Sequence, residues 1–545
     1  MKFSDKVVYQ IYPKSFYDSN GDGLGDIRGI IEKLDYIKSL GVDYIWTTPF
    51  YPSPLKDGGY DISDYTAIDP RFGTMEDFNE LVKAAAEKGL KIMLDMVLCH
   101  TSYQHEWFQR ALAGEENYQR YYILRDGRGQ GEPPTNWQCA FGGSAWEYVP
   151  RLEKWYLHLH DVSQPDLNWT NPKVREELAN VVKFWKEKGV AGFRFDVINL
   201  ISKPEIFEDD TEGLGRKLFA DGIHVHEYLS ELVKNSGIDG MITVGEMAST
   251  DLKNCLLYTR PDSHELSMSF SFHHLKIDYK NGDKWSLMDA DISALKKIFE
   301  EWQVGMTENN GWNAVFWCNH DQPRAVSRFG DDKKYWKESA KMLAAAIHLM
   351  RGTPYIYQGE EIGMTNAKFN SIEQYRDVES LNYYKILREG GKSETEALKI
   401  IGERSRDNGR TPMQWSAEKF ADFSTVEPWI SSPANYKTVN VAAEEKDSDS
   451  ILNFYKMLVK FRKENKIVQD GDIKFFEREN NDVIAYRRTL GDEKLIVICN
   501  YRGENVNLTE GNLSEYVADG YKKIFGNYEG LADNLRPFEV VVFHK

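Results

Sequence analysis

Long apolar runs are absent from this sequence of 545 residues. No stretch reaches the roughly 18 consecutive apolar residues that a membrane-crossing helix needs. Residues 1–6 also lack the apolar core of a secretion signal and lead almost directly into a strand-like run. We therefore expect no membrane partner and a cytoplasmic location.

Cysteine is scarce, and the chain contains no Cys-x-x-Cys pair, no His-Glu-x-x-His motif and no cluster of cysteine and histidine. A disulfide framework is therefore not expected, which favours a reducing compartment. A metallohydrolase is not favoured either. The five scattered cysteines are Cys99, Cys139, Cys255, Cys318 and Cys499.

Positive charge is also in short supply. The chain has 68 Lys and Arg against 85 Asp and Glu, a formal net charge of −17. Such a balance argues against nucleic acid or an anionic membrane as a partner. An anionic substrate would need a local basic pocket.

Short apolar strand patterns alternate with amphipathic helix patterns along most of the chain. This alternation predicts parallel strands joined by right-handed crossovers. Eight such strands predict an α/β fold, a (β/α)8 TIM barrel, with functional groups at the carboxyl ends of the strands. The eight patterns lie near residues 7–13, 44–48, 92–98, 192–197, 241–246, 266–272, 312–319 and 354–358.

The alternation is interrupted twice, and a chain of this length is expected to form two or three domains. Residues 101–170 are rich in Gly, Trp, Tyr and Pro and predict an irregular subdomain B inserted after the third strand. After residue 466, short β-like runs predict an antiparallel C-terminal β-sandwich domain, 467–545. The catalytic barrel then comprises residues 1–100 and 171–466, and its last helix is predicted at 451–464.

Charged and polar side chains stand at the ends of several of these apolar strands. Arg194 and Asp196 are two positions apart, so they share one face of their strand. Glu246, Asp321 and His100 end or follow three other strands. One buried Arg–Asp pair alone would be read as structural. Charges at four strand ends of one barrel favour a single assembled site.

These groups suit the cleavage of a glycosidic bond. That reaction needs one carboxylate that attacks or activates water, and a second with a raised pKa that protonates the leaving oxygen. Arg194 would keep Asp196 ionised, which suits a nucleophile. Glu246 has no cation beside it in sequence and follows apolar residues, which suits the acid.

A second motif lies in the acidic stretch at residues 18–26, after the first strand. Its oxygen-bearing residues at positions 1, 3, 5 and 9, with Gly at position 6, match the start of an EF-hand-type calcium loop. The twelfth position is Gly29 instead of Glu, and a strand instead of a helix precedes the loop, so it is not an EF-hand. We expect a structural Ca²⁺ or Mg²⁺ and no organic cofactor; the alternative is a solvated acidic turn. The predicted ligands are Asp18, Asn20, Asp22, the Leu24 carbonyl and Asp26.

Taken together, the residues resemble glycoside hydrolase family 13, the α-amylase family, over essentially the whole chain. The resemblance implies a retaining double displacement with Asp196 as nucleophile, Glu246 as acid/base, and Asp321 as the carboxylate that holds and distorts the sugar. It also implies that His100, Arg194 and His320 bind the same sugar. The motifs that carry it are Asp95 to His100, 164–168 (Gln-Pro-Asp-Leu-Asn), 192–196 (Gly-Phe-Arg-Phe-Asp), 244–246 (Val-Gly-Glu) and 319–321 (Asn-His-Asp).

Residues 164–168, Val197 and residues 405–415 look like the oligo-1,6-glucosidase branch of that family. In that branch Asp57 and Arg410 would clamp the non-reducing end, Tyr60 would stack on the ring, and Gln164 would join the sugar-binding residues. A pocket closed in this way implies an exo-acting enzyme on short substrates. Cys99 departs from the usual Asn, and it cannot hydrogen-bond as an amide does.

Within the branch, residues 265–276 most resemble members that hydrolyse trehalose 6-phosphate to glucose and glucose 6-phosphate; residues 317–320 and 213–216 favour the same reading. His273 and Lys276 follow the sixth strand, where they could bind a phosphate dianion through charge-assisted hydrogen bonds. Lys284 is a weaker candidate, and the alternative is that all three are ordinary loop charges.

Three functions therefore stand open. The first is an exo-acting hydrolase of a phosphorylated disaccharide, and the second is a glucosidase acting on isomaltose and short isomalto-oligosaccharides. The third is a non-catalytic carbohydrate-binding or transporter-associated protein of this fold. Such a protein is expected to have lost a catalytic carboxylate, whereas Asp196, Glu246 and Asp321 are all present in this chain. A trans-glycosylating isomerase would use the same residues.

Overall fold

The computed structural model describes residues 3–211, 214–509 and 511–545. Gly213, in one of the stretches singled out from the sequence, lies outside this part. Eight parallel strands form one sheet in the order β10-β11-β1-β2-β3-β7-β8-β9, and a parallel bridge between Ser269 and Asn313 connects its two ends. The predicted (β/α)8 barrel is confirmed. Its strands are β1 (Val8–Ile11), β2 (Tyr44–Thr47), β3 (Lys91–Met96), β7 (Gly192–Phe195), β8 (Ile242–Glu246), β9 (Met268–Phe270), β10 (Ala314–Val315) and β11 (Thr353–Tyr357).

Helices surround the barrel, and local sequence sets their ends. Thr74 and Asp77 form a capping box at the start of α3, and Gly237 in a left-handed conformation ends α8. The connection between β1 and β2 forms two short helices, α1 and α2, separated at Lys33, whose ammonium lies 3.8 Å from the centre of the Tyr17 ring. The surrounding helices are α1 (Ile27–Glu32), α2 (Leu34–Ser39), α3 (Met75–Glu87), α6 (Pro172–Glu187), α8 (Val225–Ser236), α9 (Leu252–Thr259), α10 (Ile292–Glu308), α12 (Trp336–His348) and α17 (Ile451–Glu464).

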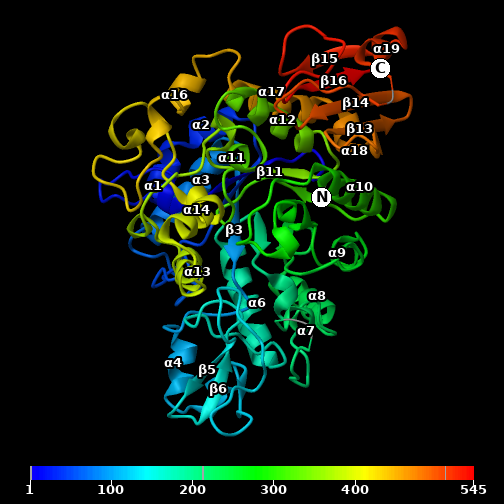
Figure 1. Ribbon diagram of the computed structural model, residues 1–545. Coiled ribbons are helices and arrows are strands. Elements are labelled where there is room, and N and C mark those ends of the chain that lie inside the picture. Colours follow the sequence, from blue (N-terminus) through cyan, green and yellow to red (C-terminus); the bar gives the residue numbers. More distant parts are fainter. Residues whose placement is uncertain (1–2, 212–213, 510) are drawn as a thin grey trace.

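The insertion after β3 is more regular than its composition suggested. It contains two short helices and a three-stranded antiparallel sheet in the order β4-β6-β5. Its strands are only two to four residues long, too short for their alternation to stand out in the sequence. In Figure 1 it lies at the opposite end of the molecule from the C-terminal sheet. Its elements are α4 (Glu106–Leu112), α5 (Glu116–Gln119), β4 (Leu124–Arg125), β5 (Trp146–Val149) and β6 (Lys154–Leu157).

The C-terminal strands form one antiparallel sheet in the order β12-β13-β14-β16-β15, and the predicted β-sandwich is wrong for the described residues. No second sheet is needed, because barrel helix α12 contacts β14 and β16. The Tyr486 hydroxyl donates to the carbonyl of Ala346 in that helix (2.8 Å). α19 (Leu513–Ala518) packs against a small apolar core of the sheet. The strands are β12 (Asp472–Phe476), β13 (Val483–Leu490), β14 (Glu493–Asn500), β15 (Lys522–Gly526) and β16 (Val540–His544).

Further helices lie between barrel strands, between β11 and α17, and directly after α17. Periodicity did not indicate these helices. No helix in the described part of the chain has both the length and the apolar character to cross a bilayer. The additional helices are α7 (Arg216–Phe219), α11 (Ala325–Phe329), α13 (Val378–Glu389), α14 (Glu394–Arg404), α15 (Asp407–Arg410), α16 (Val441–Glu444) and α18 (Lys466–Asp470).

Candidate active site

A cavity of about 570 Å³ opens at the carboxyl ends of the barrel strands. Asp196, Glu246 and Asp321, the three candidate catalytic carboxylates, all line it. They follow β7, β8 and β10, strands that are distant in sequence but lie in one barrel. The carboxylates at the strand ends therefore lie in one cavity, as their positions in the sequence predicted. Asp57, Tyr60 and His100 line the same cavity.

Arg194 lies beneath the carboxylates, with a side chain only 1% exposed. Its Nη1 donates to Asp95 Oδ1 and Asp196 Oδ1, each at 2.7 Å, and its Nη2 contacts Glu246 Oε2. The predicted pairing of Arg194 with Asp196 is confirmed. Arg194 itself is not among the residues that line the cavity. It therefore aligns the carboxylates from behind.

The contact between Arg194 and Glu246 corrects one step of the sequence argument. The role of Glu246 as the acid was inferred from the lack of a neighbouring cation, yet the barrel brings the same guanidinium to Asp196 and to Glu246. Sequence separation hid this contact, because adjacent parallel strands place residues far apart in sequence side by side. Two carboxylates on one guanidinium fit the short separation, about 5 Å, typical of retaining enzymes.

Asp95 ties this cluster to the floor of the cavity. It accepts hydrogen bonds from Trp46 Nε1 (3.1 Å) and from the Tyr60 hydroxyl (2.9 Å), in addition to Arg194. Burial raises the pKa of Asp95 to about 7, against the opposing effect of Arg194. The Tyr60 ring lies parallel to that of His320, with centroids 5.1 Å apart. Asp95 thus fixes the Tyr60 side chain at the cavity wall.

Asp321 is held ionised by three basic side chains. Its Oδ1 accepts from Arg410 Nη2 (2.7 Å) and Arg406 Nη1 (3.3 Å), and His320 Nε2 lies 3.0 Å from its Oδ2. Burial alone would raise the pKa of Asp321, but these neighbours hold it well below its usual range. A carboxylate kept negative here can accept hydrogen bonds from sugar hydroxyl groups.

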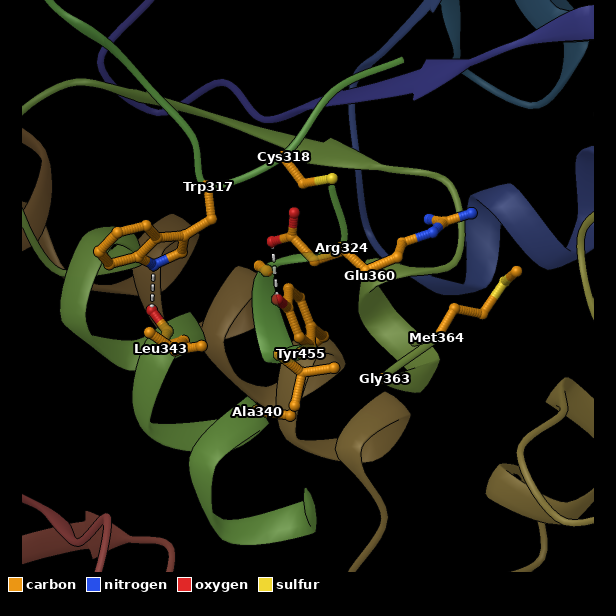
Figure 2. A pocket seen from close by; sticks show the side chains of 11 residues that line it. Trp317, Cys318, Arg324, Ala340, Leu343, Glu360, Gly363, Met364 and Tyr455 are labelled. Atoms are coloured by element: carbon orange, nitrogen blue, oxygen red, sulfur yellow. Dashed lines mark hydrogen bonds between the residues drawn. The ribbon is translucent and has the colours of Figure 1, made fainter. Parts of the chain in front are cut away.

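The loop that carries Asp321 is anchored from below (Figure 2). Trp317 Nε1 donates to the Leu343 carbonyl of α12 (2.7 Å), and the Tyr455 hydroxyl of α17 donates to Glu360 Oε1 (2.8 Å). Burial raises the pKa of Glu360 to about 8. The space between these groups is about 10 Å³, enough for one water molecule at most. This pocket supports the catalytic loop and is too small to bind a sugar.

At the predicted non-reducing end of the site, Asp57 pairs with Arg406, and Arg410 stands behind it. Arg406 Nη2 donates to Asp57 Oδ1 (2.9 Å), and Arg406 lines the cavity. Arg410 does not line it; its Nε donates to the His320 carbonyl (2.9 Å), and it supports Asp321. The two arginines are four residues apart around the single turn of α15, so the sequence could not choose between them.

Gln164 and His100 complete that end of the cavity. Gln164 Nε2 donates to Asp57 Oδ2 (3.0 Å) and lies 3.1 Å from His100 Nε2. Gln164 is fully buried behind the cavity wall. Cys99, which replaces the usual Asn, lies 3.5 Å from both Asp166 Oδ2 and Lys203 Nζ. Its thiol is therefore beside a buried ion pair, and His100 still reaches the cavity.

The predicted phosphate ligands divide into three cases. Lys276 lines the cavity, and its ammonium pairs with no carboxylate of the described residues. Lys284 also lines it, but its Nζ donates to Glu379 Oε2 (2.6 Å). His273 is not among the lining residues: its ring packs against Trp302 of α10, 5.0 Å between centroids. The prediction for His273 is therefore not supported by its position.

Arg216, on the short helix α7, belongs to the stretch 213–216 that favoured the phosphorylated substrate, but it was not predicted as a phosphate ligand. It lines the cavity and forms no ion pair within the described residues. Partial desolvation in the cavity lowers the pKa of Lys276, and the positive charge of Arg216, which lines the same cavity, lowers it further. The sequence feature that could have identified Arg216 is its place in an apolar, Gly-containing stretch after the strand that carries Asp196.

The acidic loop at residues 18–26 fits a metal ion only in part. Asp18 accepts N–H groups from Gly21 (2.7 Å) and Gly23 (2.8 Å), and Asp26 caps α1 through the Gly29 N–H (2.7 Å). In the portion of the chain that the structure describes, no group of three or more His, Cys, Asp or Glu is placed to hold a metal ion. Asp26 therefore acts as a helix cap, and the metal stays a prediction.

Comparisons with known proteins agree with this geometry. The family model "Alpha amylase, catalytic domain" matches residues 10–471. A trehalose-6-phosphate hydrolase of Bacillus subtilis (strain 168) is 49% identical over 544 residues, covering 98% of this chain and 97% of that protein. An oligo-1,6-glucosidase of Bacillus cereus is 47% identical, covering 99% of both.

Solved structures give the same result. The crystal structure of a mutant of Bacillus licheniformis trehalose-6-phosphate hydrolase, in complex with PNG, has a TM-score of 0.95 and 51% sequence identity, covering 99% of each chain. An isomaltulose synthase of Erwinia rhapontici NX5 has a TM-score of 0.93 and 37% identity, covering 99% of this chain and 98% of that one. This chain therefore belongs to the α-amylase family of glycoside hydrolases.

Proposed function

We propose that this enzyme hydrolyses trehalose 6-phosphate to glucose and glucose 6-phosphate, with retention at the anomeric carbon. The observation that carries the proposal is the pair of cations, Lys276 and Arg216, in the wall of the catalytic cavity. Neither pairs with a carboxylate within the described residues, although the chain as a whole carries a net charge of −17. Two neighbouring unpaired cations are suited to a phosphate dianion.

The position of this pair favours a phosphate on the leaving sugar. Asp57 and Arg406 close one end of the cavity, where the non-reducing glucose would lie. Arg216 belongs to α7, which follows β7, and Lys276 follows β9. Glu246, at the end of the intervening strand β8, would protonate the oxygen that joins the two sugars. A disaccharide held at one end by Asp57 and Arg406 would thus carry its phosphate toward Lys276 and Arg216.

The reaction on this proposal has two steps. Asp196 attacks the anomeric carbon while Glu246 donates a proton to the departing oxygen, which releases glucose 6-phosphate and leaves a glucosyl ester on Asp196. Glu246, now ionised, takes a proton from water, and the water releases glucose from the ester. Asp321, held ionised by Arg406 and Arg410, accepts hydrogen bonds from the sugar throughout.

One observation favours the alternative of a neutral substrate. Glu379 neutralises Lys284, which reduces the positive charge of the cavity. The identity to oligo-1,6-glucosidases is also nearly as high as to trehalose-6-phosphate hydrolases. An oligo-1,6-glucosidase acting on isomaltose would use the same three carboxylates and the same Asp57–Arg406 clamp.

Substitution of the two cations separates these functions. We expect Lys276→Met and Arg216→Met each to lower kcat/KM for trehalose 6-phosphate roughly ten- to hundredfold, mainly through KM, because each removes a charge-assisted contact. Activity on unphosphorylated trehalose should change little. Lys280→Met is the matched control, because Lys280 is an exposed lysine of the same segment that does not line the cavity. Equal losses on both substrates would contradict the phosphate assignment.

We also propose a structural Ca²⁺ at the loop of residues 18–26. The proposal is supported by side-chain oxygens at alternate positions, each accepting a backbone N–H of the loop: Asn20 from Asp22 (3.0 Å) and Asp22 from Leu24 (2.9 Å). Because a ligand that binds only the folded state stabilises it, excess Ca²⁺ should raise the melting temperature by several degrees relative to EDTA. Asp22→Ala should abolish the difference. Identical melting curves of the wild-type protein in Ca²⁺ and EDTA would contradict the metal site.

A cytoplasmic site of action belongs to the same proposal. All five cysteines are free and buried, which suits a reducing compartment. The proposed partner is a small carbohydrate, and the acidic charge of the chain disfavours nucleic acid.

A further inference from the structure

His160 stands in the wall of the catalytic cavity, and its imidazole nitrogens form no hydrogen bond with any described residue. It follows β6 in the inserted subdomain and lines the cavity together with Leu159. Its Nδ1 is buried without a hydrogen-bond partner, and its Nε2 forms no hydrogen bond with any residue that the structure describes. Polar atoms in such a position are usually satisfied, so an unpaired imidazole facing a cavity needs an explanation.

The surroundings of His160 belong to the sugar-binding end of the cavity. Its ring centroid lies 5.1 Å from that of His100 and 6.0 Å from that of Phe141. The Arg406 guanidinium, which bonds Asp57, lies 4.8 Å from the centre of the Phe141 ring. The side chain is thus part of the wall between the Asp57–Arg406 clamp and the carboxylates.

The imidazole is neutral at ordinary pH. Burial, together with the nearby His100, lowers the pKa of His160 to about 4, although Asp196 and Asp57 act in the opposite direction. A neutral imidazole has one N–H donor and one acceptor nitrogen. A hydroxyl group matches this pattern, whereas a phosphate or carboxylate offers acceptors alone.

The backbone around His160 is fixed before any substrate arrives. The Leu159 N–H donates to Asp166 Oδ1 (2.9 Å), and the Leu159 carbonyl accepts from the Ala140 N–H (2.8 Å). The His158 N–H donates to the Ala145 carbonyl (2.8 Å). These bonds fix the backbone that carries the ring, so little backbone ordering is required when a hydroxyl group binds.

We infer that His160 is a sugar-binding residue that hydrogen-bonds one hydroxyl group of the glucosyl unit held between Asp57 and Asp196. The inference rests on the proposed glucosidase activity of this cavity, and it is independent of whether the leaving sugar carries a phosphate. Binding would give the imidazole a hydrogen-bond partner, which it lacks among the residues that the structure describes. His160 then helps to decide which sugar the enzyme accepts.

Deoxy substrates test the inference. The probes are p-nitrophenyl α-D-glucopyranoside and its 2-, 3-, 4- and 6-deoxy analogues, with His160→Phe as the main variant because it keeps a flat ring and removes both nitrogens. We expect His160→Phe to lower kcat/KM for the parent glucoside at least about tenfold. For one deoxy analogue, the one that lacks the partner hydroxyl, wild type and variant should differ by less than about twofold. His160→Gln, which keeps a donor and an acceptor, should recover part of the loss.

The outcomes are distinguishable. A loss that is the same for the parent and for all four deoxy analogues would show that His160 is only an apolar or structural part of the wall, and the inference would fail while the glucosidase function stood. If the wild-type enzyme hydrolyses neither these aryl glucosides nor trehalose 6-phosphate, trehalose or isomaltose, the proposed function is overturned and this inference with it. If His160→Phe does not fold, the same comparison with His160→Leu, which also removes both ring nitrogens, decides.

Discussion

Asp196→Ala is expected to reduce kcat at least about 10⁴-fold, because it removes the group that forms the covalent intermediate. Arg194 Nη1, 2.7 Å from the carboxylate, holds Asp196 in position, and the Asp196 N–H donates to the Met96 carbonyl (2.9 Å). The next residue, Val197, has φ 34°, an unusual conformation for a β-branched residue. Such strain is typical of active sites and fixes where the side chain points.

Azide rescue assigns the role of Asp196 directly. In an α-glucoside the nucleophile attacks from the β face, so azide that occupies the space left by Asp196→Ala should yield β-glucosyl azide from a substrate with a good leaving group. The wild-type melting temperature serves as the control for folding. Retention of more than about 1% of wild-type kcat, or rescue that yields only the α-azide, would show that Asp196 is not the nucleophile.

Glu246→Ala is expected to lower kcat/KM for trehalose 6-phosphate by roughly 10² to 10⁴, because the leaving oxygen then departs without a proton. The loss in kcat/KM, which reports formation of the glucosyl enzyme, should nearly vanish with 2,4-dinitrophenyl α-glucoside. The leaving group of this substrate needs no protonation. Azide should in this case attack the glucosyl enzyme from the α face and give α-glucosyl azide.

The experiment on Glu246 is needed because the structure places Arg194 beside this carboxylate, so a missing cation can no longer identify it as the acid. Arg194 contacts both Glu246 and Asp196, so the sequence-based contrast between a paired and an unpaired carboxylate does not hold. The measurement is the ratio of kcat/KM for the two substrates in wild type and variant. An equal loss on both substrates would contradict the acid/base assignment.

The barrel and the three carboxylates were predictable because strand alternation is a local property. Arg194 and Asp196 share a face for that reason, and the carboxyl ends of parallel strands meet at one end of a barrel. Contacts between elements that are far apart in the sequence could not be predicted in this way. Nothing in the sequence of residues 405–415 indicates which of its arginines meets Asp57, and the structure selects Arg406 over Arg410.

Which cations line the cavity could also not be established from the sequence alone. Lys276 and His273 follow the same strand, but the His273 ring packs on Trp302 and does not line the cavity. Arg216 reaches the wall from a short helix without a periodic pattern. The single β-sheet at the C-terminus was mistaken for a sandwich because strand patterns do not reveal that a barrel helix covers one face.

The most direct test of the central claim is the ratio of kcat/KM for trehalose 6-phosphate to kcat/KM for trehalose, measured on the wild-type enzyme by glucose release, with isomaltose alongside. Two charge-assisted contacts from Lys276 and Arg216 predict a ratio of at least about 100, with glucose 6-phosphate formed in equal amount to glucose. A ratio near one, or faster hydrolysis of isomaltose than of trehalose 6-phosphate, would contradict the phosphorylated substrate and identify the enzyme as a glucosidase of neutral sugars.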